Sequence, residues 1–235
     1  MVRIGIIIPA YNESESIIQL VNRINQLKLN ECEINYVVIN DASTDQTLEI
    51  LQKNKINHLN LSINLGIGGA VQTGFQWAFK NQFDYAVQMD GDGQHPPEEL
   101  IKLIDAIILN GSDLIIGSRF IDKQGFQSSF FRRLGISCIS IILQLFIHQK
   151  ISDPTSGYRI FNKKAINLSF KVYPDEYPEP ESLVYFKLNG LKIAEIPVMM
   201  KERVSGKSSI SGLNSIYYMF KVSIAMFFTY FRYRK

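Results

Sequence analysis

The chain has little of what marks several large classes of protein. Its 235 residues include two cysteines, Cys32 and Cys138, too few for a disulfide framework or a cysteine metal site. A formal charge of +3 is too small to predict a nucleic-acid partner, so we expect none. The first residues lack the regions of a signal peptide, and no uncharged apolar run reaches the roughly 18 residues of a membrane span. We therefore expect a globular protein in a reducing, cytoplasmic setting.

Two common phosphate-binding motifs are missing as well. In the glycine-rich segment 66–71, Val71 stands where the dinucleotide fingerprint requires its third glycine. No Gly-Lys-Ser or Gly-Lys-Thr sequence closes a P-loop. We therefore expect neither adenine-dinucleotide nor P-loop chemistry.

What the first half does have is an alternation of buried-strand and helical patterns. Strands are expected at residues 4–8, 36–39, 59–63, 85–89 and 114–117. Helices are expected after a capping box formed by Asn12 and Glu15, around residues 48–51, and at 66–79 and 97–109. This order predicts a doubly wound α/β fold, a mostly parallel sheet with flanking helices, whose ligands gather at the carboxyl ends of the strands.

The most informative local pattern is Gln-Met-Asp-Gly-Asp-Gly-Gln-His-Pro at residues 88–96. Asp90 and Asp92 follow a predicted strand two residues apart, so their carboxylates can point to the same side. Gln94 would add a neutral oxygen, and an all-oxygen site suits Mg²⁺ or Mn²⁺. Asp-Gly-Asp-Gly also occurs in tight turns, and the pattern alone leaves that alternative equally open.

Other predicted strand ends carry polar residues too. Residues 9–13 follow the first strand, Asp41 the second, and Asn64 the third. Each has an ordinary structural explanation by itself, as a helix cap, an Asx turn or a loop residue. Four such ends on one rim of a sheet favour a binding cleft.

Several motifs in order give the chain a resemblance to a known family. It resembles the family 2 glycosyltransferases of the GT-A fold, and more narrowly the polyprenyl- or dolichyl-phosphate sugar synthases. The resemblance spans nearly the whole chain. Its motifs lie at residues 9–13, 40–45, 64–70, 90–96, 117–119, 132–135, 153–159 and 202–209.

The resemblance implies inverting, metal-dependent transfer of a sugar from a UDP- or GDP-linked donor to a polyprenyl phosphate, for a cell-envelope or surface glycan. It assigns Mg²⁺ or Mn²⁺ to Asp90, Asp92 and Gln94. The residues that it implies for the nucleotide are Pro9, Tyr11, Glu13, Asp41, Asn64, Gly68, Asp90 and Gly91. Those that it implies for the acceptor phosphate are Arg119, Arg133, Ser137 and Arg203, and it makes Asp92 and the three arginines catalytic.

The chemistry of such a transfer decides which residues are needed. A lipid monophosphate is already an anion near neutral pH, so it requires cationic binding by arginine rather than a strong base. The alternative for Arg132 and Arg133 is a solvated surface pair. Glu181 is either a helix-start acid or, for a hydroxyl acceptor on a glycan, a general base. His95 is expected to orient the metal loop through a backbone hydrogen bond, with metal ligation as the minor alternative.

The second half is expected to provide membrane contact. We predict a catalytic domain at residues 1–210, with an interfacial helix near 135–148, and an amphipathic helix at 211–235 that binds a membrane or a partner. The aromatic-rich stretch 216–231 is followed by a basic tail suited to anionic lipids, although a core helix is the alternative. We expect a peripheral enzyme on the cytoplasmic face, aided by a small membrane protein or by self-association. A non-catalytic nucleotide-sugar-binding subunit is the remaining alternative.

Overall fold

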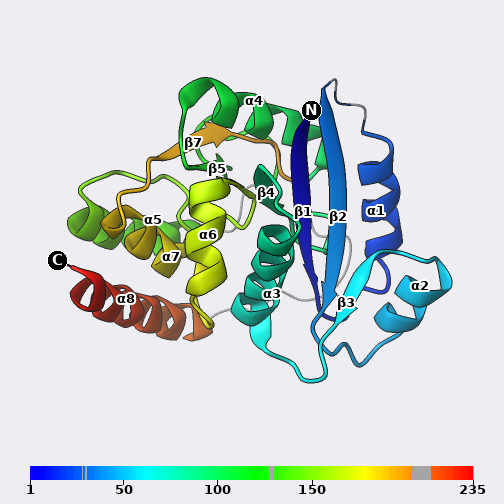
Figure 1. The fold of residues 1–235 in the computed structure, drawn as a ribbon. Coiled ribbons are helices and arrows are strands. Elements are labelled where there is room, and N and C mark those ends of the chain that lie inside the picture. The colour runs from blue at the N-terminus through cyan, green and yellow to red at the C-terminus, as the bar shows by residue number, and fades with distance from the viewer. Residues whose placement is uncertain (28, 30, 127–129, 203–212, 235) are drawn as a thin grey trace.

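A computed structural model of the chain contains a single seven-stranded sheet (Figure 1). The structure describes residues 1–27, 29, 31–126, 130–202 and 213–234. The strand order is β3-β2-β1-β4-β6-β5-β7, and β6 is antiparallel to both of its neighbours while the other pairs are parallel. The strands are β1 (Val2–Ala10), β2 (Cys32–Asn40), β3 (His58–Asn60), β4 (Tyr85–Gln88), β5 (Leu114–Ser118), β6 (Arg159–Asn162) and β7 (Ile193–Pro197).

Helices cover both faces of this sheet. They are α1 (Ile17–Asn25), α2 (Thr47–Lys53), α3 (Gly66–Lys80), the short η1 (Pro97–Glu99), α4 (Leu100–Asn110), α5 (Phe130–Ile147), α6 (Lys163–Lys171), α7 (Pro178–Leu188) and α8 (Leu213–Tyr233). One core packs α1 and α4 against alternate β1 residues such as Ile4 and Ile6. The other packs α3 and α5 to α8 against the opposite face, which includes Ile7. This two-sided cover explains why the parallel strands are continuously apolar.

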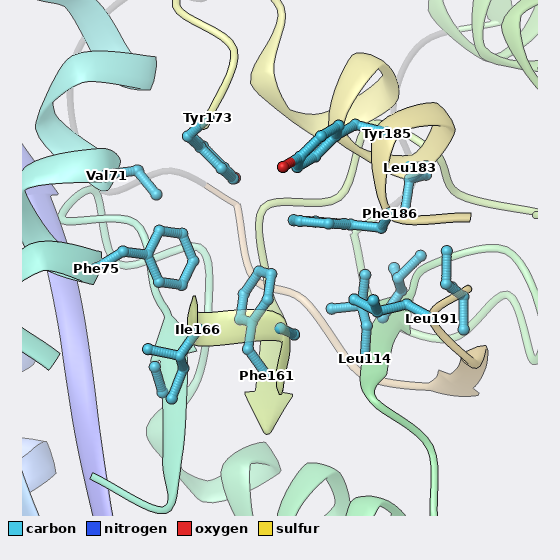
Figure 2. Packing of buried hydrophobic residues seen from close by; sticks show 14 of the residues in the cluster. Val71, Phe75, Leu114, Phe161, Ile166, Tyr173, Leu183, Tyr185, Phe186 and Leu191 are labelled. Carbon is cyan, nitrogen blue, oxygen red and sulfur yellow. The ribbon is translucent and has the colours of Figure 1, made fainter. Parts of the chain in front are cut away.

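Aromatic rings join the helices of the second core. Phe75 of α3 packs edge-on against Phe161 of β6, with ring centroids 4.8 Å apart, and Phe161 contacts Phe186 of α7 (Figure 2). Edge-to-face pairs of this kind add to the stabilisation that burial alone provides. The rings therefore attach α7, which borders the cavity described below, directly to the sheet.

The predicted α/β class and flanking helices are confirmed, with two corrections of detail. Asn12 and Glu15 do not form a capping box: α1 begins after Ser16, and Asn12 has a φ of 58° and accepts hydrogen bonds from the backbone of Thr44 and Asp45. The antiparallel β6 was not predicted. It is short, and it begins with a buried arginine, Arg159, which obscures its apolar pattern.

Helices α5 and α8 lie together at the side of the molecule remote from α1 and α2 (Figure 1). The inner face of α8 belongs to the core, since Val222 and Met226 are fully buried. Large apolar side chains cover its outer face. This outer stripe consists of Tyr217, Phe220, Ile224, Phe227, Phe228 and Phe231. Within the described residues, no helix is both long enough and apolar enough to cross a bilayer.

Candidate active site

A cavity of about 860 Å³ opens at the edge of the sheet where β1, β2 and β4 end. The loop that precedes β6 reaches the same edge, because β6 is antiparallel and its first residue, Arg159, pairs with Gln88 at the end of β4. The cavity therefore combines strand ends from the first half of the chain with the loop before β6 and with helices α5, α7 and α8 from the second half.

Five of the residues predicted for the nucleotide line one wall of this cavity. They are Pro9, Tyr11, Glu13, Asp41 and Asn64. Asp41 is 3% exposed, and its carboxylate accepts a hydrogen bond from Leu65 N at 2.7 Å. The Ser16 hydroxyl lies 2.8 Å from both a Glu13 carboxylate oxygen and the Gly91 carbonyl oxygen, so these two acceptors share its one proton. These bonds fix the wall against the loop after β4.

Gly68 has a different position from the one predicted. It does not line the cavity. Its N–H donates to the Asp175 carbonyl at 3.2 Å, and a Cβ there would lie 2.1 Å from the Pro174 carbonyl oxygen. The absence of a side chain is therefore explained by close packing of α3 against the loop before α7.

The carboxylate loop after β4 borders the cavity. Asp90, Gly91, Asp92 and Gln94 all line it. The Asp92 carboxylate accepts a hydrogen bond from Gln94 N at 2.9 Å, which holds the loop in a tight turn.

His95 stabilises this loop from beneath. Its Nδ1 accepts a hydrogen bond from Asp90 N at 3.0 Å, as predicted, and its ring stacks on Tyr158. Burial lowers the pKa of His95 to about 4, so the ring is neutral near pH 7.

The donor set fits a divalent cation that a bound diphosphate completes. Among the described residues, no group of three or more histidine, cysteine or acidic side chains could hold a metal unaided. Mg²⁺ commonly takes one or two protein carboxylates together with substrate phosphates, and its ligands are oxygens. Asp90 and Asp92 supply two such carboxylates in a cavity with room for a diphosphate. The roles of these residues and of Gln94 as ligands stay predictions.

Beyond Asp90 the floor of the cavity contains residues that were not assigned from the sequence. Gly157 leaves space there, because a Cβ at this position would lie 3.1 Å from both Asp90 carboxylate oxygens and from Gln88 Nε2. Glu179, in the first turn of α7, also lines the cavity. Burial raises the pKa of the Glu179 carboxyl; Arg159 opposes the shift and Asp90 adds to it.

Glu181, the acid singled out from the sequence, has a different environment. Its Oε1 accepts a hydrogen bond at 2.6 Å from Thr229 on α8, and it is not part of the cavity lining. Burial raises the pKa of this carboxyl as well. It therefore joins α7 to α8.

Arg119 is buried in a bidentate pair with Asp153. Its Nε and Nη2 donate to the two carboxylate oxygens, each at 2.6 Å, and Nη2 also donates to Thr155 Oγ1 at 3.1 Å. Burial alone would lower the pKa of Arg119, but the charge and hydrogen bonds of Asp153, together with the charges of Asp90 and Glu179, outweigh burial and raise that pKa. The pair fixes the loop that carries Thr155 into the cavity, and a direct contact of Arg119 with an acceptor phosphate stays a prediction.

The two adjacent arginines of α5 have different surroundings. Arg132 lines the cavity, whereas Arg133 is exposed outside it, and Ser137 Oγ donates to the Arg133 carbonyl. The cavity lining therefore includes Arg132 but neither of the predicted residues Arg133 and Ser137, and the binding of an acceptor phosphate stays a prediction. Arg203 lies outside the described residues. The cavity lining also includes the apolar side chains of Phe126, Ile136, Ile139 and Met219.

Comparison with known proteins agrees with this arrangement. The model of the family described as glycosyl transferase family 2 matches residues 5–169. The polyprenol monophosphomannose synthase of Mycolicibacterium smegmatis is 32% identical over 230 residues, which cover 93% of this chain and 84% of that protein. The UDP-N-acetylglucosamine–dolichyl-phosphate N-acetylglucosaminyltransferase of Methanococcus voltae is 31% identical over 215 residues, or 83% of this chain and 84% of that protein.

A solved structure shares the fold. It is glucosyl-3-phosphoglycerate synthase from Mycobacterium tuberculosis, in complex with Mn²⁺, UDP and phosphoglyceric acid. The two chains superpose with a TM-score of 0.71 at 17% identity, over 97% of this chain and 78% of that one. The family match, the relatives and the fold agree, and this chain belongs to glycosyltransferase family 2 and is a glycosyltransferase of the GT-A type.

Proposed function

We propose that the enzyme transfers a sugar from a nucleotide diphosphate sugar, UDP- or GDP-linked, to a polyprenyl phosphate, with inversion at the anomeric carbon. The observation that carries this proposal is the make-up of the cavity. Its lining includes the Asp90 and Asp92 carboxylates, and it also includes the Arg132 guanidinium and the apolar side chains Phe126, Ile136, Ile139 and Met219. A lipid phosphate needs both of these features, a cation for its head and an apolar path for its chain. The named relatives act on lipid phosphates of this kind.

The residues of the chain divide the work of this transfer. Pro9, Tyr11 and Asp41 bind and orient the nucleoside at the ends of β1 and β2. A Mg²⁺ or Mn²⁺ ion held by Asp90 and Asp92, with Gln94 as a further oxygen donor, supplies Lewis-acid stabilisation of the leaving diphosphate. Arg132 orients the acceptor phosphate, which is already anionic and attacks without a protein base.

The expected result of a direct assay follows from this division. Purified protein, given UDP- and GDP-linked sugars with Mg²⁺ or Mn²⁺, should label polyprenyl phosphate and leave a glycan primer unlabelled. The relatives' names differ in the sugar, so a screen of donors is part of the assay. Labelling of the primer alone would favour a hydroxyl acceptor. The Glu181 contact with Thr229 already argues against Glu181 as the base that such a reaction needs.

We also propose that the enzyme is peripheral on the cytoplasmic face of a membrane, with α8 as its contact. The outer stripe of α8 is apolar and aromatic, Arg232 lies in the last turn of this helix, and Arg234 follows it. This combination suits the boundary between acyl chains and anionic headgroups. A small membrane protein or a second copy of the chain would be an additional contact on the same surface.

Substitutions in the outer stripe are expected to weaken this attachment. Deleting α8 is a poor test, because Val222 and Met226 belong to the core. Replacing Phe220 and Phe228 with serine should instead reduce binding to anionic vesicles at least tenfold, since each buried phenylalanine contributes about 1.5–3 kcal/mol. High salt should weaken binding further by screening Arg232 and Arg234. Sedimentation with vesicles measures both effects. Leu109→Ser on α4, an exposed apolar position elsewhere, is the control, and an equal loss in that variant would contradict the assignment.

A further inference from the structure

The order of groups along the cavity indicates where the donor sugar lies. The residues proposed for the nucleoside follow β1 and β2, the carboxylates Asp90 and Asp92 follow β4, and Gly157 precedes β6. The strands are arranged β2-β1-β4-β6 in the sheet. A nucleotide sugar with its nucleoside at β1 and its diphosphate at Asp90 therefore extends its sugar toward β6 and α7.

Glu179 is the acidic side chain that α7 contributes at this point. It lies beside the space that Gly157 leaves next to the Asp90 carboxylate. The side chain of Glu179 accepts a hydrogen bond from Gln88 Nε2 at 3.4 Å. The Gln88 amide is oriented from its other side, because Gln88 Oε1 accepts a bond from the Tyr173 hydroxyl at 3.1 Å. The Glu179 carboxyl is thus held at the cavity floor, and its oxygens can accept further hydrogen bonds.

We propose that Glu179 determines donor specificity by accepting a hydrogen bond from a hydroxyl group of the transferred sugar. The inference rests on the proposed function, because it requires a nucleotide sugar in this cavity. A partly buried carboxyl discriminates strongly between a sugar that has the matching hydroxyl and one that lacks it. The sugar without the hydroxyl leaves the carboxyl oxygen without a hydrogen-bond donor.

The chain offers a matched control two residues away. Glu181 is on the same helix and is also acidic, but its carboxylate is bonded to Thr229 outside the cavity. Residues two apart on a helix point about 200° apart, because each residue turns the helix by about 100°. Glu179→Ala and Glu181→Ala therefore remove the same group from opposite sides of α7.

Calorimetric titration separates binding of the sugar from binding of the nucleotide. The probes are UDP, UDP-glucose, UDP-N-acetylglucosamine, GDP and GDP-mannose, each with Mg²⁺. For the nucleotide sugar that the wild type binds best, Glu179→Ala should weaken binding about tenfold or more, the loss expected for a hydrogen bond to a charged group. Its affinity for the matching nucleoside diphosphate should stay within twofold. Glu181→Ala should change neither affinity.

Deoxy analogues of that sugar identify the hydroxyl. One monodeoxy analogue should bind the wild type as weakly as the parent nucleotide sugar binds Glu179→Ala. The affinity of that analogue should be the same for Glu179→Ala as for the wild type. If Glu179→Ala does not fold, Glu179→Gln tests the same point with a smaller loss confined to the sugar. If Glu179→Ala loses affinity equally for the nucleotide and for the nucleotide sugar, or loses affinity for neither, the assignment is overturned. A wild type that binds none of the nucleotide sugars overturns the proposed function itself, which separates the two failures.

Discussion

Asp92→Asn and Asp92→Ala are each expected to reduce kcat/KM for sugar transfer by roughly a thousandfold. The leaving diphosphate develops negative charge, and a divalent cation that stabilises it is worth several kcal/mol, of which about 4 kcal/mol corresponds to this factor. Asp92 is 3% exposed and lines the cavity. Excess EDTA should abolish turnover of the wild type in the same way, and added Mg²⁺ or Mn²⁺ should restore it.

Asp92→Asn is the more informative of the two variants. Its amide oxygen can still accept the hydrogen bond from Gln94 N, so the loop keeps its turn while the charge is removed. Thermal unfolding should therefore be nearly unchanged. Asp105→Asn, at an exposed position on α4, controls for loss of a negative charge far from the cavity. Full activity of Asp92→Asn, or of the wild type in EDTA, would show that the carboxylate loop has no role with a metal.

Arg132→Ala is expected to lower kcat/KM for polyprenyl phosphate by about tenfold to a hundredfold. This is the range for losing a hydrogen bond to a charged partner, which contributes about 1.5–3 kcal/mol. The variant's affinity for the nucleoside diphosphate should stay near that of the wild type, because Arg132 lies on the α5 side of the cavity. Arg132→Lys should recover only part of the loss, since lysine keeps the charge but not the two-pronged geometry.

Arg133→Ala is the matched comparison. Arg133 is the next residue of the same helix, but it is exposed and does not line the cavity. We expect its transfer rate to stay within about twofold of the wild type, as is usual for exposed charges. The reverse order, with Arg133→Ala the more damaging, would return the phosphate to the arginine that the family resemblance selects. Arg203→Ala stays a prediction from that resemblance alone.

These two pairs of neighbours show where sequence reasoning loses precision. The motifs predicted arginines of the second half for the site and left Glu181 open as a helix-start acid or a base, but they could not give the rotation of α5 or α7. Successive residues of a helix point in directions that differ by about 100°. On α5, Arg132 lines the cavity and the adjacent Arg133 does not. On α7, Glu179 lines the cavity and Glu181, two residues later, does not. Rotation is set by tertiary packing, such as the contacts of Phe186 and Thr229, which no local pattern reveals.

The strand ends were more predictable, since a parallel sheet collects them at one edge whatever the details of packing. Pro9, Asp41 and Asp90 line one cavity because each follows an apolar run long enough to be a strand. The capping box was wrong because Asn12 has partners from another part of the chain. Asn12 uses its side chain to bind the backbone of Thr44 and Asp45, and this long-range contact competes with the cap that its spacing favours. Gly68 likewise suited a ligand loop and is instead required by backbone packing.

The position of β6 has a consequence for how the chain is made. Strand β6 lies between β4 and β5, although both are synthesised before it. Until Asn162 has left the ribosome, β4 and β5 cannot pair with β6. The edge of β4 that faces β6 is therefore unpaired, and this is the strand that precedes the loop with Asp90. Exposed edges of apolar strands invite pairing with other chains. A fragment that stops after β5 would carry most of the nucleotide wall, and we expect it to aggregate, whereas one that extends through β6 and α6 closes the gap.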